Sequence, residues 1–510
     1  MKLFASIMLK RATYILVLSL LPFSFFGQGV IDALRFNRTE ISGTARYVGL
    51  SGAFGALGGD ISALKKNPAG SAVFITNHAA FSTDISTVTN DVMFAGQPTK
   101  ERDYRFDINQ VGFVMVFETR NVKALANRLS FGLTYDRNNN FNNEMVAQGI
   151  NQQSIDTYFI DRANGTPLDL LVPFSGETLD ERYQFLGQTE SFATQQAYLG
   201  FESFIFDATD PDDFENTLYE SNVDASAFNQ RYRLDERGFN SVLNLNFGAQ
   251  IRKKLNVGIN LNLHVLNYDR VTRFNEQNNG SGEINEIQFN NSLSTIGSGF
   301  SIQAGAIYTP VEMIRLGVSY QSPTWYNIEE ETTQGLVTDS NEFGQASAIP
   351  RIVNIFPAYN FKKPEKFTGS MAFIIGESGL ISADYSYQDF SQTEFTSNGF
   401  ADLNQNINAT MQESIEMNLG GEYRFKEWSF RGGYHYFQSP IKNNAFVGVG
   451  DLDGFSAGLG YNVNKFTRVD LAYRRTYQDR SEELLQTDLN RQANFEQMTQ
   501  NFVLTMSFNF

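Results

Sequence analysis

The chain has 510 residues, a formal net charge of −16, 14% aromatic residues and no cysteine. Its length is enough for two or three soluble domains or for one large β-barrel. The acidic balance argues against nucleic acid as a partner, and without cysteine the chain can form neither disulfides nor the lipid-modified cysteine of a lipoprotein.

The N-terminal residues have the pattern of an export signal. Three basic residues lie within the first 11 positions, and an apolar run from Tyr14 to Phe26 leads to Gly27-Gln28, where cleavage is expected. We therefore predict a signal peptide over residues 1–27. No later run reaches about 18 apolar residues, which excludes a transmembrane helix in the remainder.

Residues 28–70 are rich in glycine and show little strand pattern. A short helix-like piece from Asp60 to Lys66 follows the glycines, and Pro68 ends it. A phosphate-binding loop is not favoured, because no strand precedes the glycines and no Gly-Lys-Ser/Thr follows them. The alternative is a compact plug, since glycine lets backbone segments approach closely.

From residue 71 to the end, apolar and polar residues alternate in many short segments. The last segment has the apolar set Phe502, Leu504, Met506, Phe508 and Phe510, with mostly polar residues between them. A period of two predicts strands with one apolar face. Because no complementary helices are available to cover these faces, we expect them to contact membrane lipid.

The connections between the predicted strands alternate in length. Tight turns alternate with long connections near 87–105, 138–236, 274–285, 329–364, 396–411, 439–452 and 481–494. Such sorting is typical of outer-membrane barrels. We therefore predict an all-β fold over residues 71–510, a monomeric transmembrane antiparallel β-barrel of about 14 strands in the outer membrane, with residues 138–236 as a long extracellular loop.

The glycine-rich segment resembles a known family. Arg46-YVGLSGAFGALGGDISALKKNPAG is similar to the N-terminal hatch of the FadL/TodX (OMPP1) outer-membrane transporters, in which a Gly/Ala-rich stretch with an acidic residue leads to Asn-Pro-Ala before the first barrel strand. The family usually has two acids before the helix, where this chain has Asp60 followed by Ile61. The matching residues are Asn67, Pro68 and Ala69, with Gly58, Gly59 and Asp60 upstream.

This resemblance has implications for fold and function. It implies that residues 28–70 form a hatch inside the barrel, and that a hydrophobic small molecule, such as a long-chain fatty acid or an aromatic compound, passes through by diffusion. A terminal Phe510 also resembles the closing strand of such barrels, where it serves as an assembly signal.

Charged and polar residues of the predicted strands are expected to face the lumen. In one interpretation they are wet lumenal residues that pair with each other and with the hatch; in the other, Arg424, Arg431 or Arg474 holds a ligand carboxylate by bidentate hydrogen bonds. His435 is a further candidate, and together with His264 it would offer two imidazoles to a haem iron. We expect no cofactor, because two imidazoles on nonadjacent strands are weak support for haem.

The long loop 138–236 is too large to be a simple connection and is expected to carry helices. Its aromatic residues either pack a cap over the barrel mouth or make first contact with an apolar ligand, the candidates being Phe185, Phe192, Phe201 and Phe204. The run Asp207-ATDPDDFE would offer carboxylates to Ca²⁺, but it lacks the spacing of a calcium loop, and we expect no metal site.

No catalytic constellation is present, so we do not expect an enzyme. Two functions from different classes fit the pattern. The first is passive uptake of hydrophobic compounds. The second, in which the barrel resembles the secretion component PorV, is a docking partner for exported proteins at the extracellular loops. A continuous apolar path into the lumen favours uptake, and a sealed polar lumen favours docking.

Overall fold

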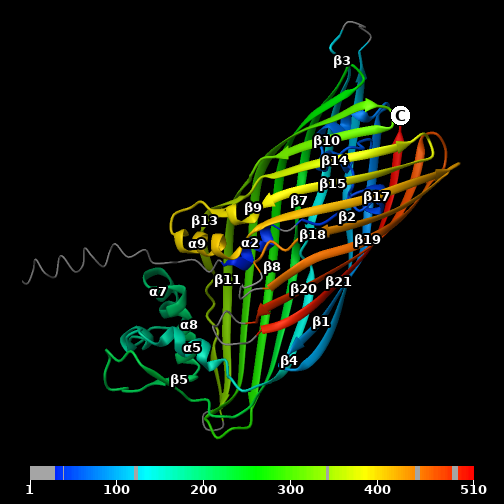
Figure 1. Cartoon of the computed structure of the whole chain (residues 1–510). Coiled ribbons are helices and arrows are strands. Elements are labelled where there is room, and N and C mark those ends of the chain that lie inside the picture. The colour runs from blue at the N-terminus through cyan, green and yellow to red at the C-terminus, as the bar shows by residue number, and fades with distance from the viewer. Residues whose placement is uncertain (1–28, 38, 120–123, 341–343, 443–447, 485–491) are drawn as a thin grey trace, which may run out of the picture.

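The computed structural model of the protein describes residues 29–37, 39–119, 124–340, 344–442, 448–484 and 492–510 (Figure 1). The signal peptide predicted for residues 1–27 lies outside the described residues. None of the helices that these residues form is long and apolar enough to cross a membrane.

The described chain is dominated by one closed antiparallel β-barrel. The first strand pairs with the second and also with the last, so the wall has no open edge (Figure 1). The barrel has fourteen strands, as predicted. The wall strands are β1 (His78–Phe94), β2 (Gln97–Glu118), β3 (Ala126–Asn140), β7 (Phe228–Ile251), β8 (Leu255–Asn278), β9 (Ile284–Val311), β10 (Ile314–Gln321) continued by β11 (Thr324–Ser340), β13 (Asn354–Lys363) continued by β14 (Lys366–Ile375), β15 (Gly379–Asp389), β17 (Glu413–Phe425), β18 (Trp428–Phe437), β19 (Gly448–Asn462), β20 (Thr467–Glu483) and β21 (Gln492–Asn509).

Two adjacent wall strands are interrupted by proline. Pro323 separates β10 from β11, and Pro364 separates β13 from β14. Proline has no N–H to donate to the strand ladder, so each interruption falls where the chain lacks a donor.

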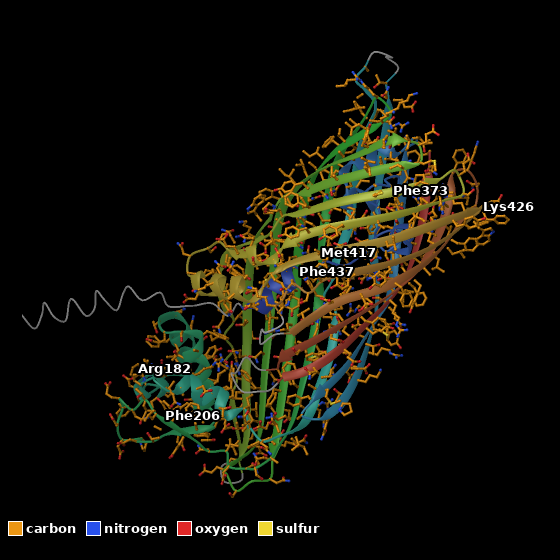
Figure 2. The ribbon with its side chains drawn as sticks, viewed as in Figure 1. Arg182, Phe206, Phe373, Met417, Lys426 and Phe437 are labelled. Carbon is orange, nitrogen blue, oxygen red and sulfur yellow. The ribbon has the colours of Figure 1, made fainter. Side chains whose placement is uncertain are left out.

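The outer face of the barrel is apolar over a limited height. In β21, Phe502, Leu504, Met506 and Phe508 are between 42% and 52% exposed, whereas the alternate Thr505 is 1% exposed. The predicted outward face of this strand is confirmed. Figure 2 shows Phe373 and Met417 on the same outer surface.

Aromatic pairs mark both borders of this band. Toward one end, Phe300 stacks on Trp325 with ring centroids 5.1 Å apart, and near the turns of the other end Trp428 contacts Tyr461 at 4.6 Å. Girdles of aromatic residues at the two membrane interfaces are a feature of outer-membrane barrels. The band between them is the part of the wall that faces lipid.

The strands extend further than the alternation predicted. Most of segment 87–105 is strand with a turn at Ala95-Gly96, and segment 329–364 contains the end of β11 and all of β13. The predicted long loops at these two places are therefore wrong. Above the lipid band both faces of a strand contact water or protein, so the sequence there loses its apolar period, as in Glu329–Thr333.

The segment predicted as the long loop 138–236 also contains strand at both ends, in β4 (Asn143–Asn151) and in the first residues of β7. Between them lies the cap, defined as residues 156–221. Its elements are α5 (Asp156–Ala163), α6 (Leu168–Leu171), α7 (Leu179–Thr189), α8 (Phe192–Glu202), β5 (Phe206–Ala208) and β6 (Tyr219–Ser221).

The N-terminal residues lie inside the barrel. We call residues 29–37 and 39–73 the plug; hydrogen bonds join it to strands all around the wall, including β3, β8, β15 and β21. Its elements are α2 (Val30–Asn37), α3 (Ala45–Gly49), α4 (Ala63–Lys66) and the 3₁₀ helix η1 (Pro68–Val73). Smaller elements near the cap end are β12 (Gly344–Ala348), β16 (Glu394–Phe395), the 3₁₀ helix η2 (Phe390–Gln392) and α9 (Ala401–Thr410).

Candidate functional site

The Asn-Pro-Ala sequence joins the plug to the wall. The side chain of Asn67 is 1% exposed; it accepts a hydrogen bond from Ala69 N and donates to the carbonyl of Gly55 at 2.7 Å, and also to the wall carbonyls of Ala306 and Val318. The carbonyl of Pro68 accepts from the Asn246 side chain at 2.9 Å. The motif therefore satisfies polar groups of both plug and wall at once.

The other residues of the predicted hatch motif shape the plug itself. Gly58 and Gly59 adopt positive φ of 61° and 64°, a conformation that favours glycine. Asp60 accepts from the Thr44 hydroxyl at 2.8 Å and from Ser62 N at 2.9 Å. The helix that follows is shorter than predicted, because it begins at Ala63 and not at Asp60.

Wall glycines allow the plug to come this close. A Cβ on Gly258 would lie 2.4 Å from the Pro68 carbonyl carbon, and one on Gly305 would lie 2.0 Å from the Asn67 amide oxygen. Contacts this short are excluded for real side chains, so glycine is required at these wall positions.

Ion pairs add to the attachment of the plug. Glu422, whose side chain is fully buried, binds Arg46 of α3 at 2.9 Å and the wall residues Arg431 at 2.7 Å and Arg424 at 2.6 Å. On another side of the lumen, Lys66 of α4 binds Glu416 at 2.9 Å and donates to the Asn418 side chain at 2.8 Å. The carboxylate of Glu422 thus pairs with three guanidinium groups.

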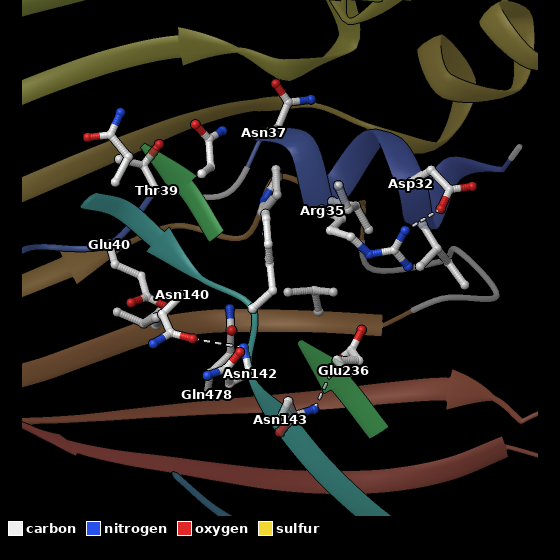
Figure 3. A pocket seen from close by; sticks show the side chains of 18 of the residues that line it. Asp32, Arg35, Asn37, Thr39, Glu40, Asn140, Asn142, Asn143, Glu236 and Gln478 are labelled. Carbon is white, nitrogen blue, oxygen red and sulfur yellow. Dashed lines mark hydrogen bonds and ion pairs between the residues drawn. The ribbon is translucent and has the colours of Figure 1, made fainter. Parts of the chain in front are cut away.

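The helix α2 lies along the lumen on the cap side of the plug, and its side chains Asp32, Arg35 and Asn37 are among those that line the pocket of Figure 3. Arg35 pairs with Asp32 and lies 4.1 Å above the ring centroid of Tyr268. Tyr268 donates its hydroxyl proton to Glu236 at 2.6 Å, and Asn143 donates to the same carboxylate at 3.0 Å. Burial raises the pKa of Glu236, but the charge of Arg35 and these hydrogen bonds outweigh burial and hold the pKa below its usual value.

The cap is attached mainly through apolar and uncharged groups. Phe159 and Tyr158 of α5 contact Phe289 of β9, with ring centroids 5.2 and 5.6 Å apart. Gln196 of α8 exchanges amide hydrogen bonds with Gln334 of β11, which also accepts from the Tyr183 hydroxyl at 3.0 Å. Carboxylates take part at two places: Glu276 of β8 accepts from Ile155 N at 3.0 Å, and Asp180 of α7 accepts from Arg351 N at 2.8 Å.

A cavity of about 430 Å³ lies between the cap and the plug. Toward the cap it is lined by the aromatic rings of Tyr158, Phe192, Phe289 and Phe356. Toward the plug its lining changes to amides and charged groups. This lower lining includes Asn37, Asn262, Lys65, Lys66, Lys363, Lys366, Glu416 and Tyr47. The volume of the cavity is in the range of small-molecule binding sites.

The predicted lumenal residues divide into two groups. Arg474 and His435 line this cavity. The guanidinium of Arg474 donates to the Asn501 amide oxygen at 2.8 Å and to the carbonyl of Ile41, and no carboxylate of the described residues lies within ion-pair distance of it. His435 Nδ1 lies 3.3 Å from the Ser51 hydroxyl.

Arg431 and Arg424 do not line the cavity. Arg431 is buried at the opposite side of the plug, where it binds Glu422 and also Asp470 at 2.8 Å, and the side chain of Arg424 is 44% exposed near the turn between β17 and β18. The four candidates for ligand binding are therefore not brought together in one place, and only Arg474 and His435 line the cavity. Alternation specifies which face of a strand a residue occupies, but not its height in the barrel.

The four aromatic residues of the cap that the sequence singles out lie in different environments. Phe192 lines the cavity and packs against Phe356 at 6.0 Å. Phe201 packs against the apolar core of the cap. Phe185 and Phe204 are 41% and 49% exposed and lie outside the cavity lining.

The metal and haem alternatives find no support in the geometry. No group of three or more His, Cys, Asp or Glu side chains in the described part of the chain is placed to hold a metal ion, and this includes Asp207–Asp213. His264 and His435 lie on β8 and β18 and face different neighbours, Ser301 and Ser51.

Sequence reasoning missed the part of the cavity formed by α2. Asp32 and Arg35 precede the recognisable hatch motif. Glu236 lies on the part of β7 that falls in the predicted loop 138–236, and Tyr268 lies beyond the alternating residues 257–265 that mark its strand. The i, i+3 spacing of Asp32 and Arg35 on a short amphipathic helix was the available signal.

Comparison with known proteins gives consistent results. A family model described as outer membrane protein transport protein (OMPP1/FadL/TodX) matches residues 214–510. Among solved structures, a Pseudomonas aeruginosa FadL homologue aligns over 92% of this chain and 99% of its own, with a TM-score of 0.55 and 12% identity. The P. putida toluene transporter TodX aligns over 92% and 99%, with a TM-score of 0.49 and 15% identity. At such identities the likeness concerns the fold. No curated protein matches the sequence.

Proposed function

This chain belongs to the family of outer membrane protein transport proteins (OMPP1/FadL/TodX), and from that premise we propose that it is a channel for passive uptake of hydrophobic small molecules through a plugged barrel. The family is one of transport channels and not of enzymes, and its barrels lie in the outer membrane. Long-chain fatty acids, or similar apolar or aromatic compounds, are the substrates we propose.

The observation that carries the proposal is the course of the cavity. It begins among aromatic rings under the cap and continues to the polar face of the plug. Burying apolar surface against such rings is worth roughly 25 cal/mol per Å², which favours capture of an apolar compound from water. The amides and basic groups deeper in the cavity suit a ligand with one polar end.

In this mechanism residues 28–70 act as the hatch. A compound held above α2 reaches the far side only after part of the plug moves, because α3, α4 and η1 bind strands on all sides. A docking function without transport is less favoured, since it predicts a sealed polar lumen, whereas the upper cavity is aromatic.

The test is uptake into proteoliposomes of a fluorescent fatty acid and of an alkyl benzene. We expect faster uptake with the barrel than with empty liposomes, and a severalfold loss in Phe192→Asp, which places a charge among the cavity rings. Phe214→Asp is the matched control, because Phe214 is 58% exposed on the cap and does not line the cavity.

Phe185→Asp separates capture on the cap surface from capture in the cavity. If its uptake falls as far as that of Phe192→Asp, the exposed cap aromatics take part in first contact. Uptake no faster than that of empty liposomes for both compounds would contradict the proposed function.

A further inference from the structure

The side of the plug that faces away from the cavity carries an excess of arginine. We define the arginine cluster as Arg46, Arg315, Arg424, Arg431 and Arg468. Around it lie the carboxylates of Glu422 and Asp470, together with that of Asp60 in the plug. Five guanidinium groups thus have three carboxylates near them, of which Glu422 and Asp470 form ion pairs with the cluster.

The cluster lies at the end of the barrel opposite to the cap. Figure 2 shows Lys426, in the turn between β17 and β18, at the end remote from Arg182 and Phe206 of the cap. Arg424 is two residues before that turn residue. The cap and the long strand extensions are extracellular in a barrel of this kind, so the cluster faces the periplasm.

The two wall carboxylates are fully engaged by the guanidinium groups already in place. Glu422 binds Arg46, Arg424 and Arg431, and Asp470 binds Arg431 and Arg468, the latter at 3.0 Å. A carboxylate has about four lone-pair sites, so little acceptor capacity remains. Nη2 of Arg431 has no hydrogen-bond partner although the side chain is fully buried.

Arg315 increases the imbalance. Its guanidinium donates to the carbonyl of Leu57 at 2.7 Å, and the charges of Arg46 and Arg424 act on it. Among the described residues, neither Glu377 nor Glu427 in the adjacent turns forms an ion pair with the cluster. Positive charge in a partly buried site requires a counter-charge.

The cluster is open on one side. The side chains of Arg424, Arg468 and Arg46 are 44%, 20% and 15% exposed, whereas Arg431 is closed off beneath them. We propose that the arginine cluster is a binding site for an oxyanion, a phosphate or a carboxylate, at the periplasmic mouth of the barrel. The planar fork of arginine matches both groups by paired hydrogen bonds.

The site also touches the plug. An oxyanion bound here competes with Glu422 for Arg46, the one member of the cluster that belongs to the plug. Binding at the mouth therefore weakens one attachment of α3 to the wall. The inference concerns binding alone and does not depend on which compound is transported.

The test uses the full barrel in a neutral detergent, with inorganic phosphate as the free-anion probe in titration calorimetry. In a second arm, barrels are assembled in nanodiscs that contain phosphatidylglycerol or only phosphatidylcholine, and the retained lipid is counted by native mass spectrometry. The variants are Arg424→Gln and Arg468→Gln. Lys426→Gln is the matched control, because it removes an exposed cation from the adjacent turn and leaves the cluster intact.

We expect each arginine variant to weaken anion binding roughly tenfold, and Lys426→Gln to leave it unchanged. Arg424→Gln leaves Glu422 bound to Arg46 and Arg431, so the plug remains attached; retention of the heat-stable barrel band in electrophoresis checks this. Binding of phosphate identifies a free anion as the ligand, and retention of phosphatidylglycerol alone identifies a lipid headgroup. Equal binding by wild type and both arginine variants in both arms, or an equal loss in Lys426→Gln, would overturn the proposal.

Discussion

The cap and the plug both obstruct the lumen, yet they are attached to the wall by different interactions. The cap joins the strand extensions through buried aromatic rings and amide pairs such as Gln196 with Gln334. The plug joins the wall through shared ion pairs at Glu422 and Glu416 and through backbone groups. Apolar contacts are lost only when surfaces separate, whereas a shared ion pair can exchange one partner for another. The difference suggests a fixed cap and a displaceable plug.

The largest effect is expected from Glu422→Gln, which removes the charge that three guanidinium groups share. Leaving buried Arg431 without this partner costs about 3–5 kcal/mol. We expect a loosened plug, measured as increased ion conductance of single barrels in planar bilayers, with the cap unaffected.

Glu413→Gln is the control for this change, because Glu413 is an exposed residue of the same strand and accepts a hydrogen bond from the hydroxyl of Tyr387 at 3.0 Å. If both variants conduct like wild type, Glu422 does not hold the plug, and the comparison between cap and plug loses its electrostatic basis.

The matching change in the cap is Phe159→Ala. Phe159 is fully buried between Tyr158 and Phe289, so truncation costs about 3–5 kcal/mol through lost contacts and a cavity. Because the wall ladder is independent of α5, we expect limited proteolysis to cut the cap while the barrel stays folded. Phe214→Ala is the control; cleavage at the same rate in both variants would show that the cap is not held by its core.

The smallest difference between plug and cap is expected in their response to acid. The pKa of Glu236 is held below its usual value, so its contribution to holding α2 is present above about pH 4.5 and is lost as the pH falls through the lower folded pKa. The chain has no cysteine, so a spin label at Ile31→Cys reports on α2 and one at Phe185→Cys on the cap.

We expect the label on α2 to become mobile on acidification below that range, before the label on the cap does. Glu236→Gln is expected to make α2 mobile at neutral pH as well. Simultaneous loosening of both labels would place the acid-sensitive group outside this contact.

The residues that the sequence predicted best are those in contact with lipid. The apolar residues from Phe502 to Phe510 occupy every second position, because hydrocarbon lies on one side of the strand and the lumen on the other. The same alternation in the other strands allows them to be counted from the sequence. Above the membrane this constraint ends, so the sequence of Glu329–Thr333 predicts a loop where the structure has a strand.

The candidate site was predicted less completely. Arg431, Arg474 and His435 were correctly placed on the buried inner face of the wall, but their heights were not predictable, since barrel tilt brings together residues from distant strands. Arg35 and Tyr268 meet across 233 positions of sequence, and no local pattern predicts such a contact.

The length of the strands has a consequence for where a solute first meets the protein. Strand β9 has 28 residues, which span about 95 Å at roughly 3.4 Å each, whereas about 9–11 tilted residues cross a membrane. Residues 284–299 of β9 therefore rise beyond the Phe300–Trp325 pair and place Phe289, one of the rings under the cap, above the lipid headgroups. If the barrel takes up apolar molecules as proposed, such a molecule meets protein before it meets lipid, and the height of the wall sets where it leaves bulk water.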